Sequence, residues 1–392
     1  MIHEPNAPFP VTLPISPVWT DPQREMLFES WLQQIQPAHH LVRDSLRLAS
    51  ADASFRRYLR VDTPTGSLVI MDAPPDKEDC KPFAKVAQLM ADAGIKAPQV
   101  LAWDEANGFM LLPDLGTHTM MQVMNPQAPP PLDLYLQAVD TLVQWQLASA
   151  EGVLPPYDRA LLARELELFP QWYITEYRQV TLDAAQRKTL DEAFACIMDN
   201  NLAWPSVYVH RDFMPRNLMV PLEDAAQFAA GPPQGKLAPL GGSAVRAATS
   251  VGAHLGVLDF QDAVYGPITY DIASLMRDAF LSWDEDFCLD VTIRYWEKAR
   301  KAGLPVGDDF GEFYRGVEWM GLQRHLKVAG IFARLTLRDG KPQYLADTPR
   351  FIGYIRATCG RYRELKPLLR LVEELEGVFV PNMLAFRRPQ AK

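Results

Sequence analysis

Apolar and polar residues alternate in the first part of the chain, and a period of two indicates half-buried β-strands. Turn-forming residues such as Thr63-Pro-Thr-Gly66 separate the alternating stretches, and a loop of small residues at 50–56 joins the first two. The predicted strands cover residues 45–49, 57–61, 67–71 and 108–112. We therefore expect the N-terminal part to contain a small β-sheet.

Most of the remaining chain has apolar residues three and four positions apart, which is helical spacing. One short helix containing Trp31 is predicted before the strands, and another near 81–93. A proline-rich segment at 126–131 then leads into a longer helical region. Its predicted helices cover residues 132–150, 159–179, 182–200, 272–282, 285–302, 310–335 and 349–377. The expected fold class is therefore α+β.

The predicted organisation is two lobes with two flexible segments. Residues 1–20 are rich in proline and form a tail, 21–116 form the smaller lobe, and 117–392 form the larger lobe. Within the larger lobe, 221–254 is rich in Ala, Gly and Pro, and a loop of this length is uncommon in a compact domain. This composition favours a flexible insertion, with a lid or a docking surface as alternatives.

Composition and charge exclude several classes of protein. The net charge of -9 argues against a nucleic-acid-binding protein, which normally has a basic face. No apolar run is long enough to span a bilayer, so no membrane role is expected, and the N-terminus does not resemble a signal peptide. The four cysteines are scattered without a Cys-x-x-Cys pair, which favours reduced thiols and a cytoplasmic location.

Two apolar runs are each followed by polar residues of the kinds that catalytic sites contain. The first leads into His210-Arg-Asp212, with Asn217 five positions later, and the second ends at Asp259. Two carboxylates and an amide at strand ends are what a magnesium-nucleotide phosphotransferase needs. Asp212 is the candidate catalytic residue, and Asn217 and Asp259 are the candidate metal ligands. A solvated turn is the alternative, but the order of strand, loop, strand and second aspartate favours catalysis.

The pattern His-x-Asp-x4-Asn followed by Asp-Phe resembles the catalytic loop and metal-binding aspartate of kinases. Asp259 is not followed by Ala-Pro-Glu. The chain continues into Gly266-Pro-Ile-Thr-Tyr-Asp271, which resembles the aminoglycoside-phosphotransferase and choline-kinase-like branch of the protein-kinase-like superfamily. This resemblance implies a bilobal protein-kinase-like fold with ATP and Mg²⁺ as cofactors. Asp271 is expected to brace the catalytic loop by hydrogen bonds.

The smaller lobe is expected to bind the nucleotide. Ser50 and Ser54 are small enough to let their loop approach phosphates, although an ordinary hairpin loop is the alternative. The third strand ends in Asp72 where a protein kinase has a lysine, so another cation must neutralise the phosphates. Arg57 is the preferred candidate because it lies just after the loop. The other candidates are Arg56, Arg60 and Lys77.

The turn Pro113-Asp-Leu-Gly116 resembles the hinge between the lobes of this family. The resemblance implies that backbone groups near Leu112 and Asp114 bind the adenine edge. A plain exit from a strand is the alternative.

Four stretches together resemble the bacterial anomeric N-acetylmuramate/N-acetylglucosamine kinases of cell-wall recycling. They run from His210 to Met219, Leu258 to Ala263, Gln323 to Leu335 and Val69 to Pro75. The likeness covers about residues 28–370, with 221–254 unmatched. It implies ATP-dependent phosphorylation of the anomeric hydroxyl of an amino sugar, and a functional link to a sugar-1-phosphate nucleotidyltransferase.

The candidate substrate contacts are one carboxylate and three cations. Asp262 could be a substrate-side or second metal-side carboxylate. Arg178 and Arg324 could bind the lactyl carboxylate of N-acetylmuramate, as could Lys327, although a solvated basic face is the default for charges on this helix. A kinase of another small acceptor, such as an aminoglycoside or amino alcohol, and a non-catalytic nucleotide-binding module are the alternative functions.

Overall fold

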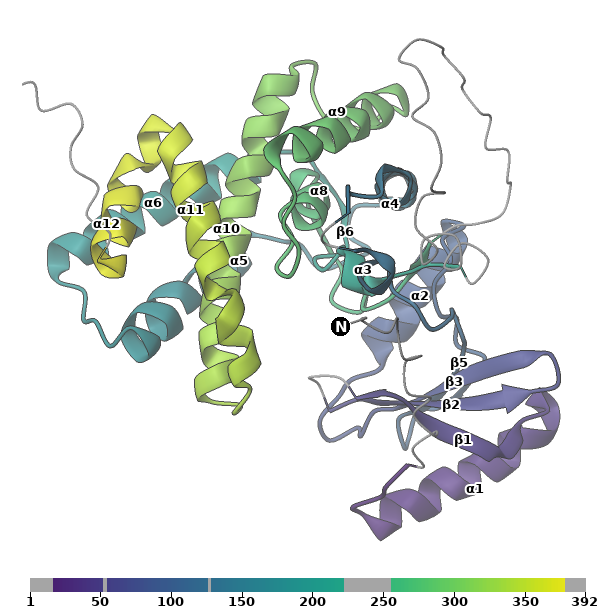
Figure 1. Ribbon diagram of the computed structural model, residues 1–392. Coiled ribbons are helices and arrows are strands. Elements are labelled where there is room, and N and C mark those ends of the chain that lie inside the picture. The colour runs from purple at the N-terminus through teal and green to yellow at the C-terminus, as the bar shows by residue number, and fades with distance from the viewer. Residues whose placement is uncertain (1–16, 52–54, 126–127, 222–254, 378–392) are drawn as a thin grey trace, which may run out of the picture. The chain divides into compact units, whose positions relative to one another are not determined.

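The computed structural model describes residues 17–51, 55–125, 128–221 and 255–377. The chain forms two compact units, of which the first comprises the part up to Thr119 together with Met219–Asp262. The second comprises Met120–Leu218 and the chain from Ala263 onwards. No helix within the described ranges combines the length and the apolar character needed to cross a membrane. A β-rich first unit and a helical second unit confirm the predicted α+β class (Figure 1).

The first unit is built on a five-stranded antiparallel sheet with the order β1-β2-β3-β5-β4. Its elements are α1 (Pro22–His39), β1 (Val42–Ala51), β2 (Arg57–Thr63), β3 (Gly66–Asp72), α2 (Lys81–Asp92), β4 (Ala102–Asp104) and β5 (Phe109–Pro113). A separate short pair consists of β7 (Leu218–Met219) and β8 (Gly256–Val257). The backbone amide of Val257 also donates to the carbonyl of Lys96 at 2.8 Å, which ties β8 to the first unit.

Helix α1 covers one face of this sheet (Figure 1). It begins after Asp21, whose side chain accepts a hydrogen bond from the Gln23 amide at 2.9 Å. The apolar side of α1 and the facing strand residues form one buried cluster. Its members are Phe28, Trp31, Leu32, Ile35, Leu41, Leu59, Val61, Ile70, Phe109 and Leu111. Because successive strand residues point to opposite faces, Tyr58, Met71 and Met110 lie on the other face of the sheet.

The second unit is mainly helical, with a short antiparallel pair of β6 and β9 that positions the loop predicted to be catalytic. Its elements are α3 (Met120–Val123), α4 (Leu132–Leu147), α5 (Arg159–Leu166), η1 (Phe169–Tyr177), α6 (Ala184–Leu202), β6 (Ser206–Val209), η2 (Pro215–Asn217), β9 (Val264–Pro267), α8 (Thr269–Met276), α9 (Glu285–Lys301), α10 (Phe310–Leu337), η3 (Pro342–Asp347), α11 (Thr348–Arg361), η4 (Arg363–Leu365) and α12 (Lys366–Glu376). Helix α10 passes through the middle of this unit, with α11 along one side of it (Figure 1). Its buried residues form one core with those of η1, α6, α11 and α12.

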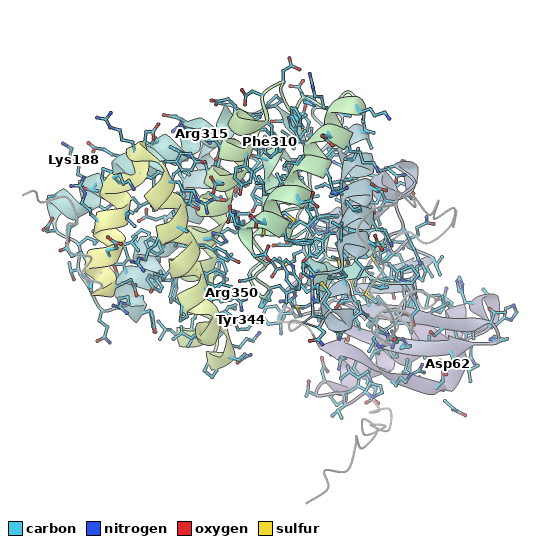
Figure 2. All side chains as sticks on the ribbon, turned by 45° about the horizontal axis from the view of Figure 1, so that its top comes forward. Asp62, Lys188, Phe310, Arg315, Tyr344 and Arg350 are labelled. Atoms are coloured by element: carbon cyan, nitrogen blue, oxygen red, sulfur yellow. The ribbon has the colours of Figure 1, made fainter. Side chains whose placement is uncertain are left out.

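Helix α11 is anchored at its start by two residues that are labelled in Figure 2. Tyr344 packs its ring 5.0 Å from that of Phe332 on α10. Arg350 donates a hydrogen bond to the carbonyl of Ala279 at 3.0 Å. These contacts hold α11 against the core of the second unit.

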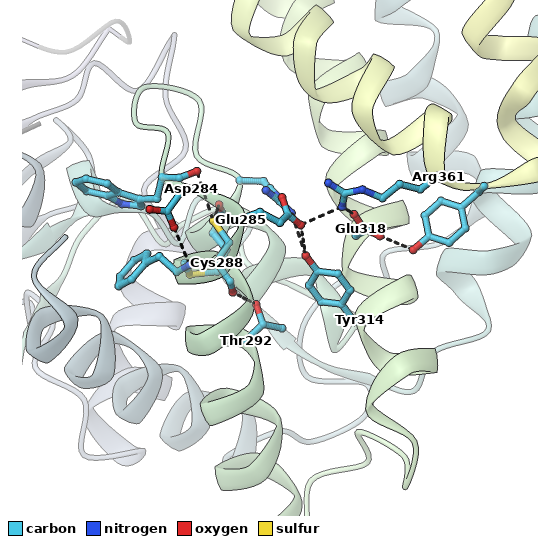
Figure 3. Close-up of polar contacts among 12 residues, drawn as sticks. Asp284, Glu285, Cys288, Thr292, Tyr314, Glu318 and Arg361 are labelled. Carbon is cyan, nitrogen blue, oxygen red and sulfur yellow. Dashed lines mark hydrogen bonds and ion pairs between the residues drawn. The ribbon is translucent and has the colours of Figure 1, made fainter. Parts of the chain in front are cut away.

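A polar cluster that is buried at Glu318 and exposed at Glu285 joins α9, α10 and the end of α11 (Figure 3). Glu318 of α10, only 4% exposed, accepts hydrogen bonds from Arg361 and Tyr362. Arg361 also pairs with Glu285 at 3.0 Å, and Glu285 accepts a hydrogen bond from the Tyr314 hydroxyl at 2.5 Å. The cluster links three helices and gives the buried carboxylate of Glu318 the hydrogen-bond partners that it needs.

Several predicted elements have different bounds in the structure, among them the helices predicted at 159–179 and 349–377 and the strand predicted at 45–49. The stretch 159–179 is α5 followed by a π-helix, η1, and 349–377 is broken at Tyr362, where the backbone is extended with φ -106° and ψ 130°. The Tyr362 ring packs 5.7 Å from that of Trp319 on α10, so this break is fixed by a distant residue. Strand β1 extends to Ala51, which places Ser50 in the strand opposite Tyr58 instead of in the predicted loop.

Candidate active site

The loop after β6 is clamped by Asp271, a buried residue of α8. Its carboxylate accepts the backbone amide of His210 at 2.7 Å and that of Arg211 at 3.0 Å. Arg211 has a φ of 77°, a left-handed conformation that is unusual for a residue with a side chain. Burial raises the pKa of Asp271 to about 6, although the interaction with the His210 side chain and both amide hydrogen bonds act in the opposite direction. The predicted bracing role of Asp271 is therefore confirmed.

Asp212 is held through its backbone, not through its carboxylate. Its amide donates to Nδ1 of His210 at 3.2 Å, and its carbonyl accepts Nδ2 of Asn217 at 2.9 Å. Among the residues that the structure describes, none donates a hydrogen bond to the partly exposed carboxylate of Asp212. This carboxylate can therefore accept a hydrogen bond from an acceptor hydroxyl.

Asn217 ends the short helix η2 and is 8% exposed. Its amide nitrogen donates to the Asp212 carbonyl, and its side-chain oxygen is of the kind that can coordinate a cation. A neutral amide oxygen is a donor that Mg²⁺ accepts. The loop thus orients Asp212 and Asn217 together, as the spacing of five residues predicted.

Buried Glu165 of α5 neutralises two cations next to the catalytic loop. Its Oε1 lies 2.5 Å from Nη2 of Arg211 and 2.9 Å from Nζ of Lys327. Its Oε2 accepts the Tyr157 hydroxyl at 2.5 Å and Nε2 of Gln323 at 3.0 Å. Burial would raise the pKa of Glu165, but the two cations and the hydrogen bonds lower it to about 2. The sequence analysis missed this residue, because one acid in an amphipathic helix normally faces solvent.

Arg324 lies against the catalytic loop and is 5% exposed. Its Nη1 donates to the carbonyl of Arg211 at 2.5 Å, and its guanidinium carbon lies 4.8 Å from the centre of the Tyr270 ring. Within the described ranges, no carboxylate oxygen lies within 4.0 Å of its nitrogens. Arg324 thus differs from Lys327, whose charge is paired with Glu165.

Arg178 follows η1 and is bound to the last helix. Its Nη2 donates to the carbonyl of Leu375 at 2.6 Å, and its Nη1 lies 3.6 Å from Glu376. Tyr173 also donates to Glu376 at 2.7 Å. None of the hydrogen bonds that Arg178 forms with described residues reaches the catalytic loop.

In the first unit, Asp259 follows β8 in a left-handed conformation, with φ 62°. Its exposed carboxylate accepts Nε2 of Gln261 at 2.9 Å. The next residue, Phe260, is buried against Phe83 of α2, with 4.9 Å between ring centres. Asp262 lies in the same turn and is also exposed. The buried Phe260 therefore anchors a turn whose two aspartates face solvent.

Asp72, the residue at the kinase lysine position, is neutralised by two arginines. Arg57 lies 2.5 Å from one carboxylate oxygen, and Arg24 of α1 lies 2.6 Å from the other. The two guanidinium groups also stack on aromatic rings, each at 4.2 Å, Arg57 on Trp19 and Arg24 on Phe109. Arg57 therefore lies on the face of the sheet that α1 covers. The contribution of Arg24 could not be read from the sequence, because it precedes Asp72 by a helix and two strands.

The remaining nucleotide candidates occupy the sheet and its exit. Leu112 is in β5 and 2% exposed, and the Asp114 carboxylate accepts Arg60 at 2.5 Å and the Ser67 hydroxyl at 2.6 Å. Burial would raise the pKa of Asp114, but these bonds and one from the Gly116 amide lower it. Ser54 lies outside the described residues.

Comparison with family models gives one match in this chain. The model of the phosphotransferase enzyme family matches residues 45–229 and 250–309. Residues 230–249 fall between the matched segments.

Sequence relatives cover nearly the whole chain. A protein of Neisseria meningitidis serogroup B named N-acetylmuramate/N-acetylglucosamine kinase is 46% identical over 358 residues, which are 91% of this chain and 97% of the relative. A Pseudomonas putida protein of the same name is 44% identical over 360 residues, covering 92% and 95% of the two chains.

Solved structures with much lower identity share the fold. Plasmodium vivax ethanolamine kinase has a TM-score of 0.55 at 11% identity, with 88% of this chain and 92% of that chain covered. An aminoglycoside phosphotransferase described as putative, from Ralstonia eutropha, has a TM-score of 0.54 at 13% identity, with 89% and 98% covered. These similarities confirm the kinase-like fold that the sequence predicted.

Proposed function

Because this chain belongs to the phosphotransferase enzyme family and is therefore a phosphotransferase, we propose that it transfers the γ-phosphate of ATP to the anomeric hydroxyl of N-acetylmuramate or N-acetylglucosamine. The relatives named for these two sugars, at 42–46% identity, support the choice of acceptor. The observation that carries the proposal is the clamped loop, in which Asp271 fixes the backbone and the Asp212 carboxylate has no donor from the described residues.

The proposed reaction uses Asp212 to orient and deprotonate the sugar. Its carboxylate accepts the proton of the anomeric hydroxyl while the hydroxyl oxygen forms a bond to the γ-phosphorus. The bond between that phosphorus and the β-phosphate oxygen breaks, and ADP leaves. An anomeric hydroxyl is more acidic than an ordinary alcohol, so positioning and electrostatics can supply most of the catalysis.

We assign Mg²⁺ to Asn217 and Asp259, one amide and one carboxylate. When bound, this ion neutralises phosphate charge. The donors fit, because Mg²⁺ is commonly held by one or two protein oxygens together with phosphates and water. The described ranges contain no group of three His, Cys, Asp or Glu, so a fully protein-made metal cage is not found there. Backbone groups near Leu112 and Asp114 are the proposed adenine contacts.

For the sugar, Arg324 is the best-placed cation of the three considered. Lys327 and Arg178 both face carboxylates, whereas Arg324 touches the catalytic loop without such a partner in the described ranges. We propose that Arg324 binds the lactyl carboxylate of N-acetylmuramate and that Asp262 contacts the sugar.

The product would be a sugar 1-phosphate, the kind of compound that a nucleotidyltransferase consumes, and a role in peptidoglycan recycling is part of the proposal. A cytoplasmic location is part of the proposal. The four cysteines are free thiols in the structure, as a reducing compartment favours.

The test is ADP release from Mg-ATP with each amino sugar, beside glucose, kanamycin, choline and a reaction without acceptor. We expect turnover with the N-acetyl sugars and a product that no longer reduces copper, because its anomeric position is blocked. Asp212→Asn should lower kcat roughly 10²- to 10⁴-fold, the usual contribution of a general base.

Asp191→Asn is the control, since this acid of α6 is exposed and pairs only with Arg187 in the described chain. Its turnover should match that of the unmodified protein. Turnover with a different acceptor alone would reject the sugar, and a full rate in Asp212→Asn would reject the catalytic assignment.

A further inference from the structure

We propose that Arg56, held by Glu78, is the cation that binds the α- and β-phosphates of the nucleotide, in place of the lysine that Asp72 replaces. This inference rests on the proposed use of a nucleotide, but it does not depend on the sugar. The residues involved all belong to the first unit.

The strand register places Arg56 at the end of β3. Arg57 is opposite Asp72, the last residue of β3, so Arg56 lies one position beyond that end. Arg57 and Asp72 face α1 together with the buried cluster of that helix. Because adjacent strand residues alternate, Arg56 points to the opposite face, where its side chain is hydrogen-bonded to that of Tyr58.

The same face carries the proposed adenine contact. Leu112 and Met110 of β5 lie on it, followed across the sheet by Met71 of β3 and Tyr58 of β2, which are register partners. Met71 and Met110 are fully buried, and Leu112 is 2% exposed. A nucleotide has an apolar base and anionic phosphates. This face has the same order, because it is apolar near the proposed adenine contact at Leu112 and ends at the buried Arg56.

Glu78 gives Arg56 the partner that a kinase lysine has. Their Nη2 and Oε2 atoms lie 3.0 Å apart, with side-chain exposures of 10% and 16%. Glu78 precedes α2 by two residues and also accepts the backbone amide of Phe55 at 3.3 Å, next to Arg56 in the chain. Burial disfavours the charge on Arg56, but Tyr58 and Glu78 outweigh it and raise the pKa, so the guanidinium stays charged. Its five donors allow it to bind a carboxylate and a phosphate together.

The other candidate cations, Arg57, Arg60 and Lys77, interact with other side chains. Arg57 directs Nε and Nη2 to Asp72, and Arg60 directs the same two atoms to Asp114. Lys77 lies 4.9 Å from the centre of the Phe55 ring. Arg56 is therefore the arginine at the end of β3 that combines a glutamate partner with a position on the face of Leu112 and Tyr58.

Calorimetric titration of the full chain with Mg-ADP and with adenosine, which lacks phosphates, tests the proposal. Arg56→Gln should weaken Mg-ADP binding at least tenfold and change adenosine binding less than twofold. Arg56→Lys should restore most of the Mg-ADP affinity, because the charge returns. Arg47→Gln is the control: Arg47 is another acid-paired arginine of this sheet, 2.8 Å from Asp62, and both affinities should stay unchanged.

Equal weakening for both ligands in Arg56→Gln would show a structural role and overturn the proposal. A loss of Mg-ADP affinity in Arg57→Gln but not in Arg56→Gln would show that Arg57 binds the phosphates. This result would also overturn the proposal. If circular dichroism shows that Arg56→Gln does not fold, Glu78→Gln takes its place, and only a selective loss of Mg-ADP affinity would support the proposal. No acceptor is present in these titrations, so a wrong choice of sugar would not affect them.

Discussion

The carboxyl group of Asp271 has two properties that favour opposite protonation states. Its two oxygens accept the amides of His210 and Arg211, which requires the ionised form. Its burial favours the protonated form and raises the pKa from 3.8 to about 6. Catalysis and folding stability should therefore respond to pH with opposite signs over this interval.

The first consequence concerns activity. Protonation of Asp271 removes an acceptor from the clamp, so kcat/KM should fall about tenfold per pH unit below about 6. The measurement is a pH profile between 5 and 8, run with the acceptor that turns over. A flat profile through pH 6 would show that the clamp works equally well when protonated.

The stability of the fold should change in the other direction. A raised pKa means that the folded state binds the proton more tightly than the unfolded state does. The contribution of Asp271 is thus complete below 3.8 and is lost as the pH rises through about 6, a change on the order of 3 kcal/mol. Urea unfolding of the unmodified protein and Asp271→Asn at several pH values between 4 and 7 measures it.

Asp278 provides the matched control for both experiments. Burial raises its pKa to about 6 as well, but its carboxylate accepts the amides of Phe280 and Leu281, not those of the catalytic loop. Asp278→Asn should therefore make the stability profile less steep, because only the contribution of Asp271 remains, and should leave the activity profile in place.

Individual site residues could be predicted only where the residues that act together are close in the sequence. Asp212 and Asn217 share a loop of a few residues, so their spacing carries the chemistry without knowledge of the fold. Glu165 and Arg24 form ion pairs with residues that are far away in the sequence. No motif near either residue indicates these pairs. The pairing appears only when α5 and α1 are packed against their neighbours.

At the scale of elements, α10 packs closely against the backbone of Leu168 at Gly330. A Cβ added there would lie 2.3 Å from the carbonyl oxygen of Leu168, between α5 and η1. Gly330→Ala should therefore cost roughly 1–3 kcal/mol of the free energy of unfolding, since the backbone must move. Gly353→Ala on α11, where a Cβ meets no atom within 4 Å, should stabilise the protein by about 0.5–1 kcal/mol.

Thermal and urea unfolding of the two alanine variants measure this difference. Two variants of equal stability would contradict the close packing at Leu168. The sequence predicted a single helix at 159–179 because apolar periodicity continues through the segment, and the contact of Leu168 with a glycine in another helix cannot be read from that periodicity. Helical spacing predicts the existence of helices well, and their ends are set by tertiary contacts.

At the scale of the whole molecule, the predicted kinase-like α+β fold is confirmed, and the chain between β7 and β8 is longer than the pairing of these two strands requires. The strands pair with one another. The family match omits 230–249. Replacement of 230–249 by a short Gly-Ser linker should therefore leave kcat/KM within about twofold, because extra loop length changes closure entropy only slightly.

Steady-state kinetics and a thermal melt of the shortened chain check this expectation. The control is a scrambled 230–249 of the original length, which should behave in the same way. A loss of activity in both variants would assign a specific role to this sequence.

The discontinuity of the first unit has a consequence for synthesis. The chain leaves this unit after Thr119 and returns only at Met219, so β8 is translated after β6 of the second unit. Domains usually fold on the ribosome in N-to-C order. Here the N-terminal sheet can form early, but the nascent unit cannot be complete until residue 262 has emerged from the exit tunnel.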